Sequence, residues 1–117
     1  MSNITIYGIS TCDTIKKTLD WFKANKLEVS FHNYKKQGIE TEKLTDWSKV
    51  VGWQLLLNKK GTTWRTLSPA AQLAIVDETT AIEFMRQNTS SIKRPVIEFG
   101  KKVLVGFDEE ILKKLFA

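Results

Sequence analysis

The sequence contains a single cysteine, Cys12, which lies between a short β-branched run and a helical pattern. Residues 3–7 predict a strand, and the spacing of Ile15, Leu19 and Phe22 predicts an amphipathic helix. A side chain at the start of a helix faces backbone N–H groups without partners and the positive end of the helix dipole. Both favour a thiolate over a thiol. We therefore predict that Cys12 is nucleophilic, with a pKa below the usual value of about 8.5.

Polar neighbours help to decide between a reactive cysteine and a buried structural thiol, since free cysteine is often buried. Ser10, Thr11 and Asp13 flank Cys12 and argue against an apolar environment. Lys16 lies one helical turn further on, where its positive charge would also favour the thiolate. The reactive interpretation is therefore preferred.

Composition limits the class of protein. The 117 residues, 42% hydrophobic and 26% charged, predict one soluble globular domain over residues 1–117. One cysteine cannot form an internal disulfide, and one cysteine with one histidine, His32, cannot build the usual zinc site, so no metal site is expected. No apolar run approaches the ~20 residues of a membrane-spanning helix, and no signal-peptide pattern is present. We expect a cytoplasmic protein without a membrane partner.

The net charge of +5 could indicate an anionic partner. The lysines occur in scattered pairs, which favours a solvated surface over a nucleic-acid-binding face, although an anionic small substrate also suits this balance. The tryptophans at positions 21, 47, 53 and 64 are interpreted as packing residues and not as a base-stacking platform. His32 is assigned a structural or exposed role, without a Cys/His dyad.

The predicted elements follow the order β-α-β, helical block, β-β-α. A second strand at 28–34 is followed by a polar loop at 35–38 and a helical block at about 40–89. Residues 95–105 predict an antiparallel hairpin with a tight Gly-Lys turn, and Asp108 caps a last helix. A β-α-β unit with a helical crossover implies parallel strands. This order predicts an α/β protein of thioredoxin-like fold, with a mixed four-stranded sheet and a helical insertion.

Start signals divide the helical block. Thr41 is a candidate N-cap, and Ser68 followed by Pro69 combines a side-chain cap with proline at the first helical position. Residues 80–83 have the pattern of a capping box. The apolar residues assigned to the last two of these helices are Leu73, Ile75, Val76, Ile82 and Met85.

Three loops are predicted to meet in this fold: the Cys12 loop, residues 93–95 and residues 106–108. Pro95 enters a strand next to the reactive cysteine, which suggests a cis peptide bond with Arg94. Such a bond would leave the backbone N–H and C=O of Arg94 open to a peptide-like ligand. The Arg94 guanidinium is predicted to hold a carboxylate or an oxyanion in a bidentate pair; the alternative is a surface salt bridge.

A series of short motifs runs along the whole chain. They are Tyr7-Gly8-Ile9, Cys12-Asp13-Thr14-Ile15-Lys16-Lys17, Phe31-His32-Asn33-Tyr34, Gly52-Trp53, Leu56-Leu57-Asn58, Gly61-Thr62-Thr63-Trp64-Arg65, Ile92-Lys93-Arg94-Pro95 and Gly106-Phe107. None is specific alone. Together and in this order, they make the chain resemble the ArsC/Spx family of the thioredoxin fold, and most of all its YffB-like branch.

The chain also departs from two branches of that family. Arsenate reductases of the family use a cysteine with three arginines, of which Cys12 and Arg94 match here. Asn58 stands where the second arginine is expected. The position of the third falls near Val105–Gly106, where there is no arginine either, which argues against arsenate reduction. The redox-switch branch carries Cys-x-x-Cys, but Ile15 occupies the fourth position, so an internal disulfide switch is excluded.

The resemblance implies a thiol/disulfide reductase that acts through a single cysteine, with glutathione as co-substrate and no bound cofactor. The expected catalytic residues are Cys12 and Arg94. The alternatives are an arsenate reductase and an Spx-like regulatory protein that docks on a protein partner without catalysis. The residues expected to bind glutathione or the substrate are Thr11, Lys16, Arg94, Pro95, Gly106 and Arg65.

Overall fold

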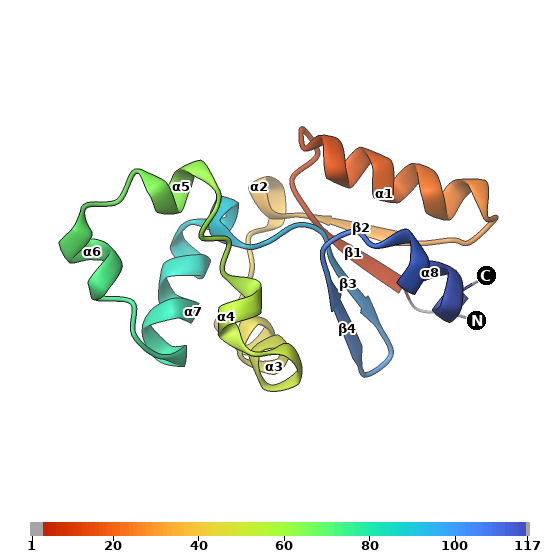
Figure 1. Cartoon of the computed structure of the whole chain (residues 1–117). Coiled ribbons are helices and arrows are strands. Elements are labelled where there is room, and N and C mark those ends of the chain that lie inside the picture. The colour runs from red at the N-terminus through yellow and green to blue at the C-terminus, as the bar shows by residue number, and fades with distance from the viewer. Residues whose placement is uncertain (1–3, 117) are drawn as a thin grey trace. The chain divides into compact units, whose positions relative to one another are not determined.

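The computed structural model describes residues 4–116, which form two compact units. One unit comprises Met1–Asn33 and Arg94–Ala117, and the other comprises Tyr34–Lys93. Residue 3, which the predicted first strand includes, lies outside the described residues, and the single domain over 1–117 with an insertion at about 40–89 stays a prediction. The elements of the first unit are β1 (Ile4–Gly8), α1 (Asp13–Ala24), β2 (Ser30–Asn33), β3 (Val96–Phe99), β4 (Lys102–Val105) and α8 (Glu109–Phe116) (Figure 1).

The first unit is built on a mixed four-stranded sheet. The strand order is β2-β1-β3-β4, in which β1 runs parallel to β2 and antiparallel to β3, and β3 runs antiparallel to β4. The parallel pair is connected through α1, as parallel neighbours require a crossover. In the turn between β3 and β4, Gly100 has a φ of 58°, a left-handed conformation that glycine adopts without steric cost. The predicted α/β class, thioredoxin-like order and hairpin are confirmed.

Both helices of this unit cover the same face of the sheet. Side chains alternate along a strand, so Ile4 and Ile6 of β1 share a face, and Ile97 of β3 lies directly opposite Ile6. These three side chains form a buried cluster with the apolar faces of α1 and α8. The cluster fixes α1, and therefore the residues at its N-terminus, against the sheet. The helical members of the cluster are Ile15, Phe22 and Leu112.

The second unit is helical. Trp47 of α3 is fully buried, and α3 packs on α7, where Ile82 and Met85 are buried as predicted. Ser48 Oγ donates a 2.7 Å hydrogen bond to Glu78 Oε2, which joins α3 to the first turn of α7. The elements are α2 (Tyr34–Gln37), α3 (Thr41–Val51), α4 (Trp53–Leu56), α5 (Thr62–Arg65), α6 (Pro69–Leu73), α7 (Glu78–Gln87) and η1 (Thr89–Ser91).

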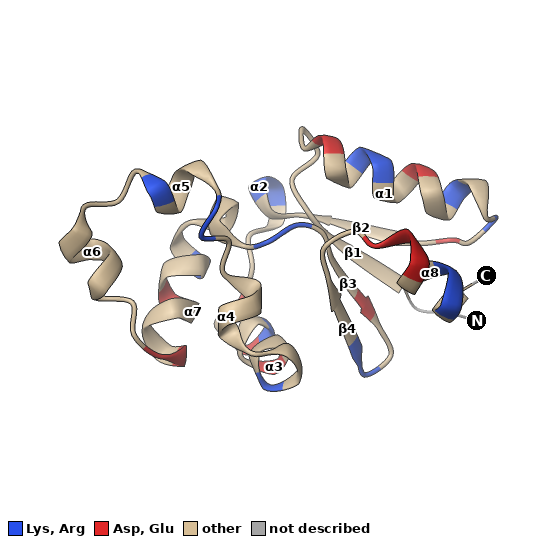
Figure 2. Cartoon of the chain, viewed as in Figure 1, with Lys and Arg blue, Asp and Glu red and all other residues tan. Residues whose placement is uncertain are grey.

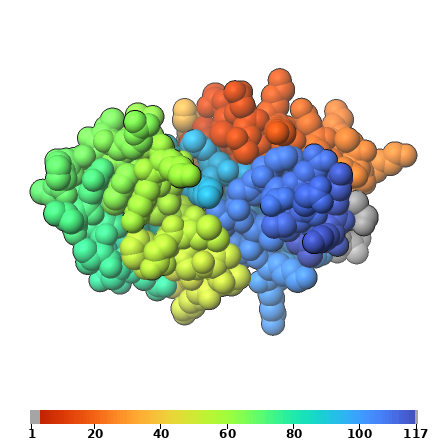
Figure 3. Space-filling view, viewed as in Figure 1, coloured from red at the N-terminus to blue at the C-terminus, as the bar shows by residue number. Residues whose placement is uncertain are grey.

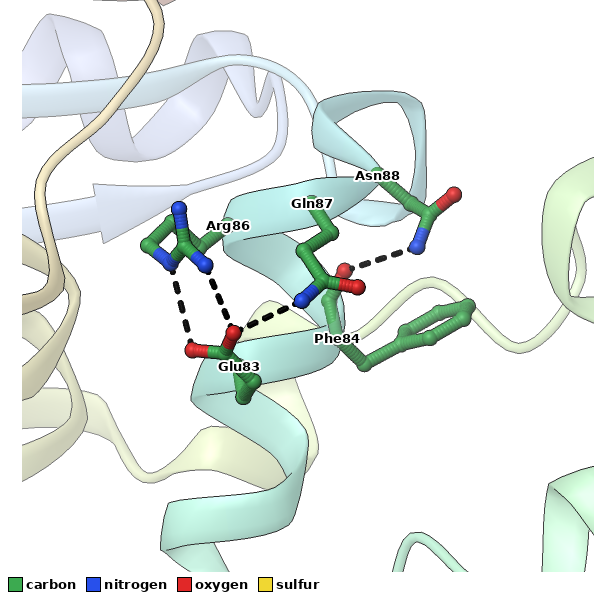
Figure 4. A network of polar contacts seen from close by, with 5 residues as sticks. All are labelled: Glu83, Phe84, Arg86, Gln87 and Asn88. Carbon is green, nitrogen blue, oxygen red and sulfur yellow. Dashed lines mark hydrogen bonds and ion pairs between the residues drawn. The ribbon is translucent and has the colours of Figure 1, made fainter.

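The last turns of α7 carry a polar network (Figure 4). Arg86 donates from Nε to Glu83 Oε2 at 3.1 Å and from Nη2 to Glu83 Oε1 at 2.6 Å. Gln87 Nε2 donates to the same carboxylate at 2.7 Å. The hydrogen bonds from Arg86, and then the one from Gln87, hold the pKa of the Glu83 carboxyl below its usual range. All of these contacts are exposed, so their support of the helix is modest.

Three predicted boundaries in this unit are wrong. The N-cap of α3 is Glu40, without a side-chain cap hydrogen bond, and Thr41 is its first helical residue. The capping box of α7 begins earlier than predicted: Asp77 Oδ1 accepts the Thr80 N–H at 2.9 Å, and Thr80 Oγ1 accepts the Asp77 N–H at 3.2 Å. A threonine hydroxyl both donates and accepts, so it serves equally at the N-cap and at the third helical position. The predicted polar loop after β2 begins with the short helix α2.

The helix that begins after Ser68 is shorter than predicted. Ser68 Oγ accepts the Ala71 N–H at 3.1 Å and Pro69 follows at the first helical position, so the predicted start is confirmed. The helix ends at Leu73, which is 76% exposed, and Val76 lies beyond it and is 68% exposed. The apolar residues at this place are therefore surface residues and not the core residues that their spacing suggests.

Candidate active site

The strand register brings three loops to one end of the sheet. Tyr7 of β1 lies opposite Val96 of β3, and Val96 lies opposite Val105 of β4. Because both pairs are antiparallel, the end of β1 and the end of β4 meet the start of β3. The Gly106 N–H also donates a 2.8 Å hydrogen bond to the Pro95 C=O, which ties the loop after β4 to the loop before β3. The predicted meeting of the three loops is confirmed.

Cys12 is the half-buried N-cap residue of α1, with an extended backbone (φ −83°, ψ 128°). Its N–H donates to the Ile9 C=O at 3.0 Å, which closes the turn after β1. Its C=O accepts the Lys16 N–H at 3.1 Å, the first hydrogen bond of the helix. The cysteine also packs partly against the buried cluster of the sheet. These contacts fix the thiol at the helix N-terminus, where the sequence predicts it.

The pKa of the Cys12 thiol lies below its ordinary value. Burial raises this pKa, but the backbone N–H groups of Ile15 and Thr14, the positive charge of Arg94 and the Thr14 hydroxyl together lower it by more. The Cys12 side chain makes no N-cap hydrogen bond of ordinary geometry, so we attribute much of the effect to the N–H dipoles of the first turn. The direction agrees with the prediction from the sequence.

Arg94 precedes Pro95, and the peptide bond between them is cis, as predicted. The Arg94 side chain is half-buried, and its Cγ lies 4.0 Å from the point where a Cβ of Gly8 would stand, so its aliphatic part packs beside the end of β1. Among the described residues of its own unit, no carboxylate forms a salt bridge with Arg94. The guanidinium therefore supplies positive charge to the thiol and retains its capacity to pair with an anion.

The remaining predicted ligand residues lie in different places. Thr11 and Lys16 are exposed beside the cysteine. The cation that lowers the pKa of Cys12 is Arg94, whereas the contribution predicted for Lys16 is not found. Arg65 is an exposed residue at the end of α5, in the second unit. The ligand-binding roles assigned to these residues stay predictions.

Two contacts with aromatic rings lie close to the site: one involves His32, and the other involves Lys17. His32 of β2 lies opposite Tyr7 of β1, with ring centroids 4.9 Å apart, which supports a structural role. Lys17 places its Nζ 5.2 Å from the centroid of the Phe107 ring. This cation–π contact joins α1 to the loop before α8. Both residues belong to motifs named from the sequence, but their contact was not predicted.

Gly8 positions the site because the absence of a Cβ leaves room for the side chain of Ile15. A Cβ at this residue would collide with Cδ1 and Cγ1 of Ile15, which is 1% exposed and cannot turn aside. Gly8→Ala is therefore expected to lower the free energy of unfolding by about 1–3 kcal/mol, the usual cost of overpacking, and to displace the start of α1. Urea denaturation measures the first effect, and the alkylation rate of Cys12 measures the second. Lys101→Ala, at the exposed turn between β3 and β4, is the control. Unchanged stability and unchanged alkylation would contradict this role for Gly8.

The position of Cys12 also predicts its alkylation as a function of pH. The thiolate is the reacting species, so the rate with iodoacetamide should rise with pH and reach its midpoint below about 8.5. The sequence has one cysteine, so mass spectrometry of the intact chain reports this residue alone. The same chain unfolded in urea is the matched control and should show the usual midpoint. Equal midpoints in the two states would remove the case for an activated thiol.

Two kinds of feature are absent from residues 4–116. No helix there combines the length and apolar character needed to cross a membrane. No group of three or more histidine, cysteine, aspartate or glutamate side chains among these residues is arranged to hold a metal ion.

Known proteins match this chain almost from end to end. The sequence profile of the ArsC family matches residues 7–115. An uncharacterized protein of Haemophilus influenzae is 40% identical over 114 residues, which cover 97% of this chain and 99% of that protein. The solved structure of a protein named YffB has a TM-score of 0.93 and 43% identity, covering 98% of this chain and 100% of the other. The solution structure of an arsenate reductase (ArsC) related protein from Brucella melitensis has a TM-score of 0.78 and 40% identity, covering 97% and 94%. The chain therefore belongs to the ArsC family.

Proposed function

We propose that this protein is a glutathione-dependent thiol/disulfide reductase that acts through Cys12. The observation that carries the proposal is the thiol at the N-terminus of α1, whose pKa is held down by the first-turn N–H groups and by Arg94. A lowered pKa increases the thiolate fraction at a given pH, and the thiolate is the species that attacks disulfides. The absence of a second cysteine in the sequence excludes resolution within the chain.

The proposed reaction has two exchange steps. In the first, the Cys12 thiolate attacks the glutathione sulfur of a glutathionylated substrate; a new sulfur–sulfur bond forms, the old one breaks, and the substrate leaves as a thiolate that takes up a proton. In the second, the thiolate of free glutathione attacks the glutathione sulfur of this mixed disulfide. Oxidised glutathione leaves and the Cys12 thiolate is restored. Over the two steps, the glutathionylated substrate and one free glutathione give the substrate thiol and oxidised glutathione: the substrate sulfur is reduced, and the sulfur of the free glutathione is oxidised.

The surroundings of the thiol are suited to glutathione. A carboxylate of glutathione would pair with the Arg94 guanidinium, with Pro95 and Gly106 forming the wall beside it. Thr11 and Lys16 would line the side formed by α1. Asp108 is less available to bind the amino group of glutathione, because its Oδ1 accepts the N–H of Glu110 at 3.1 Å and so caps α8. A cytoplasmic location, where the glutathione pool is kept reduced, would suit this reaction and is part of the proposal.

The proposal is tested with a glutathionylated peptide as substrate, coupled to glutathione reductase and NADPH. We expect turnover that depends on free glutathione, and a glutathione adduct on Cys12 when the reaction is stopped early and the intact chain is weighed by mass spectrometry. Rapid alkylation of Cys12 together with no turnover of the glutathionylated peptide would overturn the proposal, because the thiol would then be reactive without being a reductase for this class of disulfide.

Arsenate reduction is expected to be weak or absent, although one relative is described as arsenate reductase related. Asn58 and Gly106 carry no charge, so they cannot supply what two arginines would give to a bound oxyanion. A coupled assay with glutathione and glutaredoxin at saturating arsenate measures the activity, with and without Cys12→Ser. Robust turnover that this substitution abolishes would show that the missing arginines are dispensable.

A further inference from the structure

The second unit has an apolar groove on its surface. It has a volume of about 460 Å³ and is lined by Lys59, Trp64, Pro69, Gln72, Leu73, Ile75 and Val76. Helix α6, which contributes several of these side chains, carries no charged residue (Figure 2). The residues from α5 to α6, green in the space-filling view, lie at the surface (Figure 3). The groove therefore exposes large apolar side chains that folding would otherwise bury.

Hydrogen bonds hold the walls of this groove in place. Gln72 Nε2 donates to the Trp64 C=O at 3.0 Å, which ties α6 to α5. The Val76 N–H donates to Thr80 Oγ1 at 3.1 Å, which fixes the end of the groove to α7. The exposed apolar side chains therefore sit on an ordered backbone. A preformed surface of this kind loses little conformational entropy when it binds a partner.

A cationic pocket adjoins the groove. It has a volume of about 210 Å³, and Lys59, Lys60 and Lys93 line it with Gln54, Leu55, Leu57 and Asn58. The two cavities share Lys59, whose Nζ lies 5.4 Å from the centroid of the Trp64 ring. Among the described residues that line either cavity, none is acidic. Three lysines without a carboxylate among them create a positive potential that favours an anionic partner.

Backbone contacts fix the lysines of this pocket. The Lys93 N–H donates to the Leu56 C=O at 2.7 Å, and the Asn58 N–H donates to the Ser91 C=O at 2.8 Å, so two distant segments lie side by side. Asn58 Oδ1 accepts the Lys60 N–H at 3.1 Å. The segments that carry the cations are thus set next to the groove by the fold, whereas the scattered pairs in the sequence gave no sign of this.

We propose that the groove and the cationic pocket together bind an acidic peptide segment of a partner protein. Apolar side chains of the peptide would fill the groove beside Trp64 and Leu73, and its carboxylates would meet the lysines at one end. Charge complementarity selects this class of partner, since a phosphate backbone would leave the apolar half of the surface uncovered and a neutral apolar segment would leave the lysines unpaired. This surface is independent of the thiol chemistry proposed above.

The first test is a selection from a random display library of peptides of about twelve residues against the full chain. We expect enriched peptides that combine several carboxylates with a cluster of large apolar residues. Failure to enrich any peptide, or enrichment of peptides without acidic residues, would overturn the proposal.

The second test measures the affinity of one enriched, fluorescein-labelled peptide by anisotropy. Leu73→Ser, Val76→Ser and Lys60→Glu should each weaken binding about tenfold, and higher salt should weaken it further. Val50→Ser and Lys101→Glu are matched controls, because both residues are exposed and neither lines the groove or the pocket. Cys12→Ser should leave binding unchanged, which separates this proposal from the reductase.

The remaining experiments test whether something other than an acidic peptide occupies the groove. Sedimentation of the wild-type chain should show a monomer; a dimer that Leu73→Ser dissociates would assign the groove to a second copy of the chain and overturn the proposal. Binding to anionic vesicles that competes with the peptide and is as strong would assign it to a lipid surface. Loss of peptide binding in the two control variants would show that the contact is non-specific.

Discussion

Cys12→Ser should reduce glutathione-dependent turnover by on the order of a thousandfold or more, to the uncatalysed background. A serine hydroxyl is a weak nucleophile at neutral pH, and its oxygen cannot form the mixed disulfide through which the proposed reaction passes. The substitution replaces one small side chain by another at an N-cap position where serine is favoured, so the fold should persist. The coupled assay with the glutathionylated peptide measures the loss of activity.

The control for this substitution is the thermal unfolding of the variant, followed by circular dichroism. A midpoint close to that of the wild-type chain would show that lost activity reflects lost chemistry. Turnover that survives the substitution would mean that glutathione reduces the peptide without the protein thiol, and the proposed function would then have no basis. The same variant is also the reference for the uncatalysed exchange between glutathione and the peptide in the assay.

Arg94→Ala should have two separable effects. Loss of the nearby positive charge should raise the pKa of Cys12 toward its usual value and shift the alkylation midpoint upward. Loss of the bidentate partner should also raise the KM for glutathione about tenfold or more, since a hydrogen bond to a charged group contributes about 1.5–3 kcal/mol. The pH dependence of alkylation and steady-state kinetics measure these effects independently.

Arg94→Lys separates the effect of the positive charge on the Cys12 pKa from the binding of glutathione. Lysine keeps the charge but lacks the planar fork that pairs with a carboxylate, so the alkylation midpoint should stay near the wild-type value while the KM for glutathione stays high. An Arg94→Ala variant with normal kinetics and a normal alkylation midpoint would exclude this arginine from the site. If alanine and lysine raise the KM while neither moves the midpoint, Arg94 binds glutathione without activating the thiol.

The sheet and the loops around Cys12 follow from the sequence because their determinants are local and numerous. Alternating apolar residues define the strands, and the β-α-β and hairpin connections restrict the strand order to few alternatives. Once that order is set, antiparallel register alone brings the start of β3 to the end of β1, so Arg94 and Pro95 must approach Cys12. The approach of Arg94 and Pro95 to Cys12 could therefore be predicted without knowledge of long-range side-chain contacts.

Other features could not be predicted because they depend on the folded environment. The role of Gly8 lies in a missing Cβ, and only the packed position of Ile15 reveals it. The helix starts near residues 41 and 77–80 were misplaced because neighbouring polar residues compete for the same cap. The exposure of Leu73 and Val76 was missed because apolar spacing predicts burial, whereas α6 ends at Leu73 and both side chains remain at the surface.

The presence of a single cysteine determines which kind of disulfide the oxidised protein can form. A protein with two neighbouring cysteines holds its oxidised state as an internal disulfide, because the high effective concentration of the second thiol favours that bond over a mixed disulfide with an outside molecule. These 117 residues contain no such couple, so an oxidised disulfide state of Cys12 always includes a second molecule. Its population then depends on the concentration of that molecule and has no fixed midpoint potential of its own. The mixed disulfide persists until a free thiol attacks it, so the composition of the surrounding thiol pool sets how long the modified state lasts.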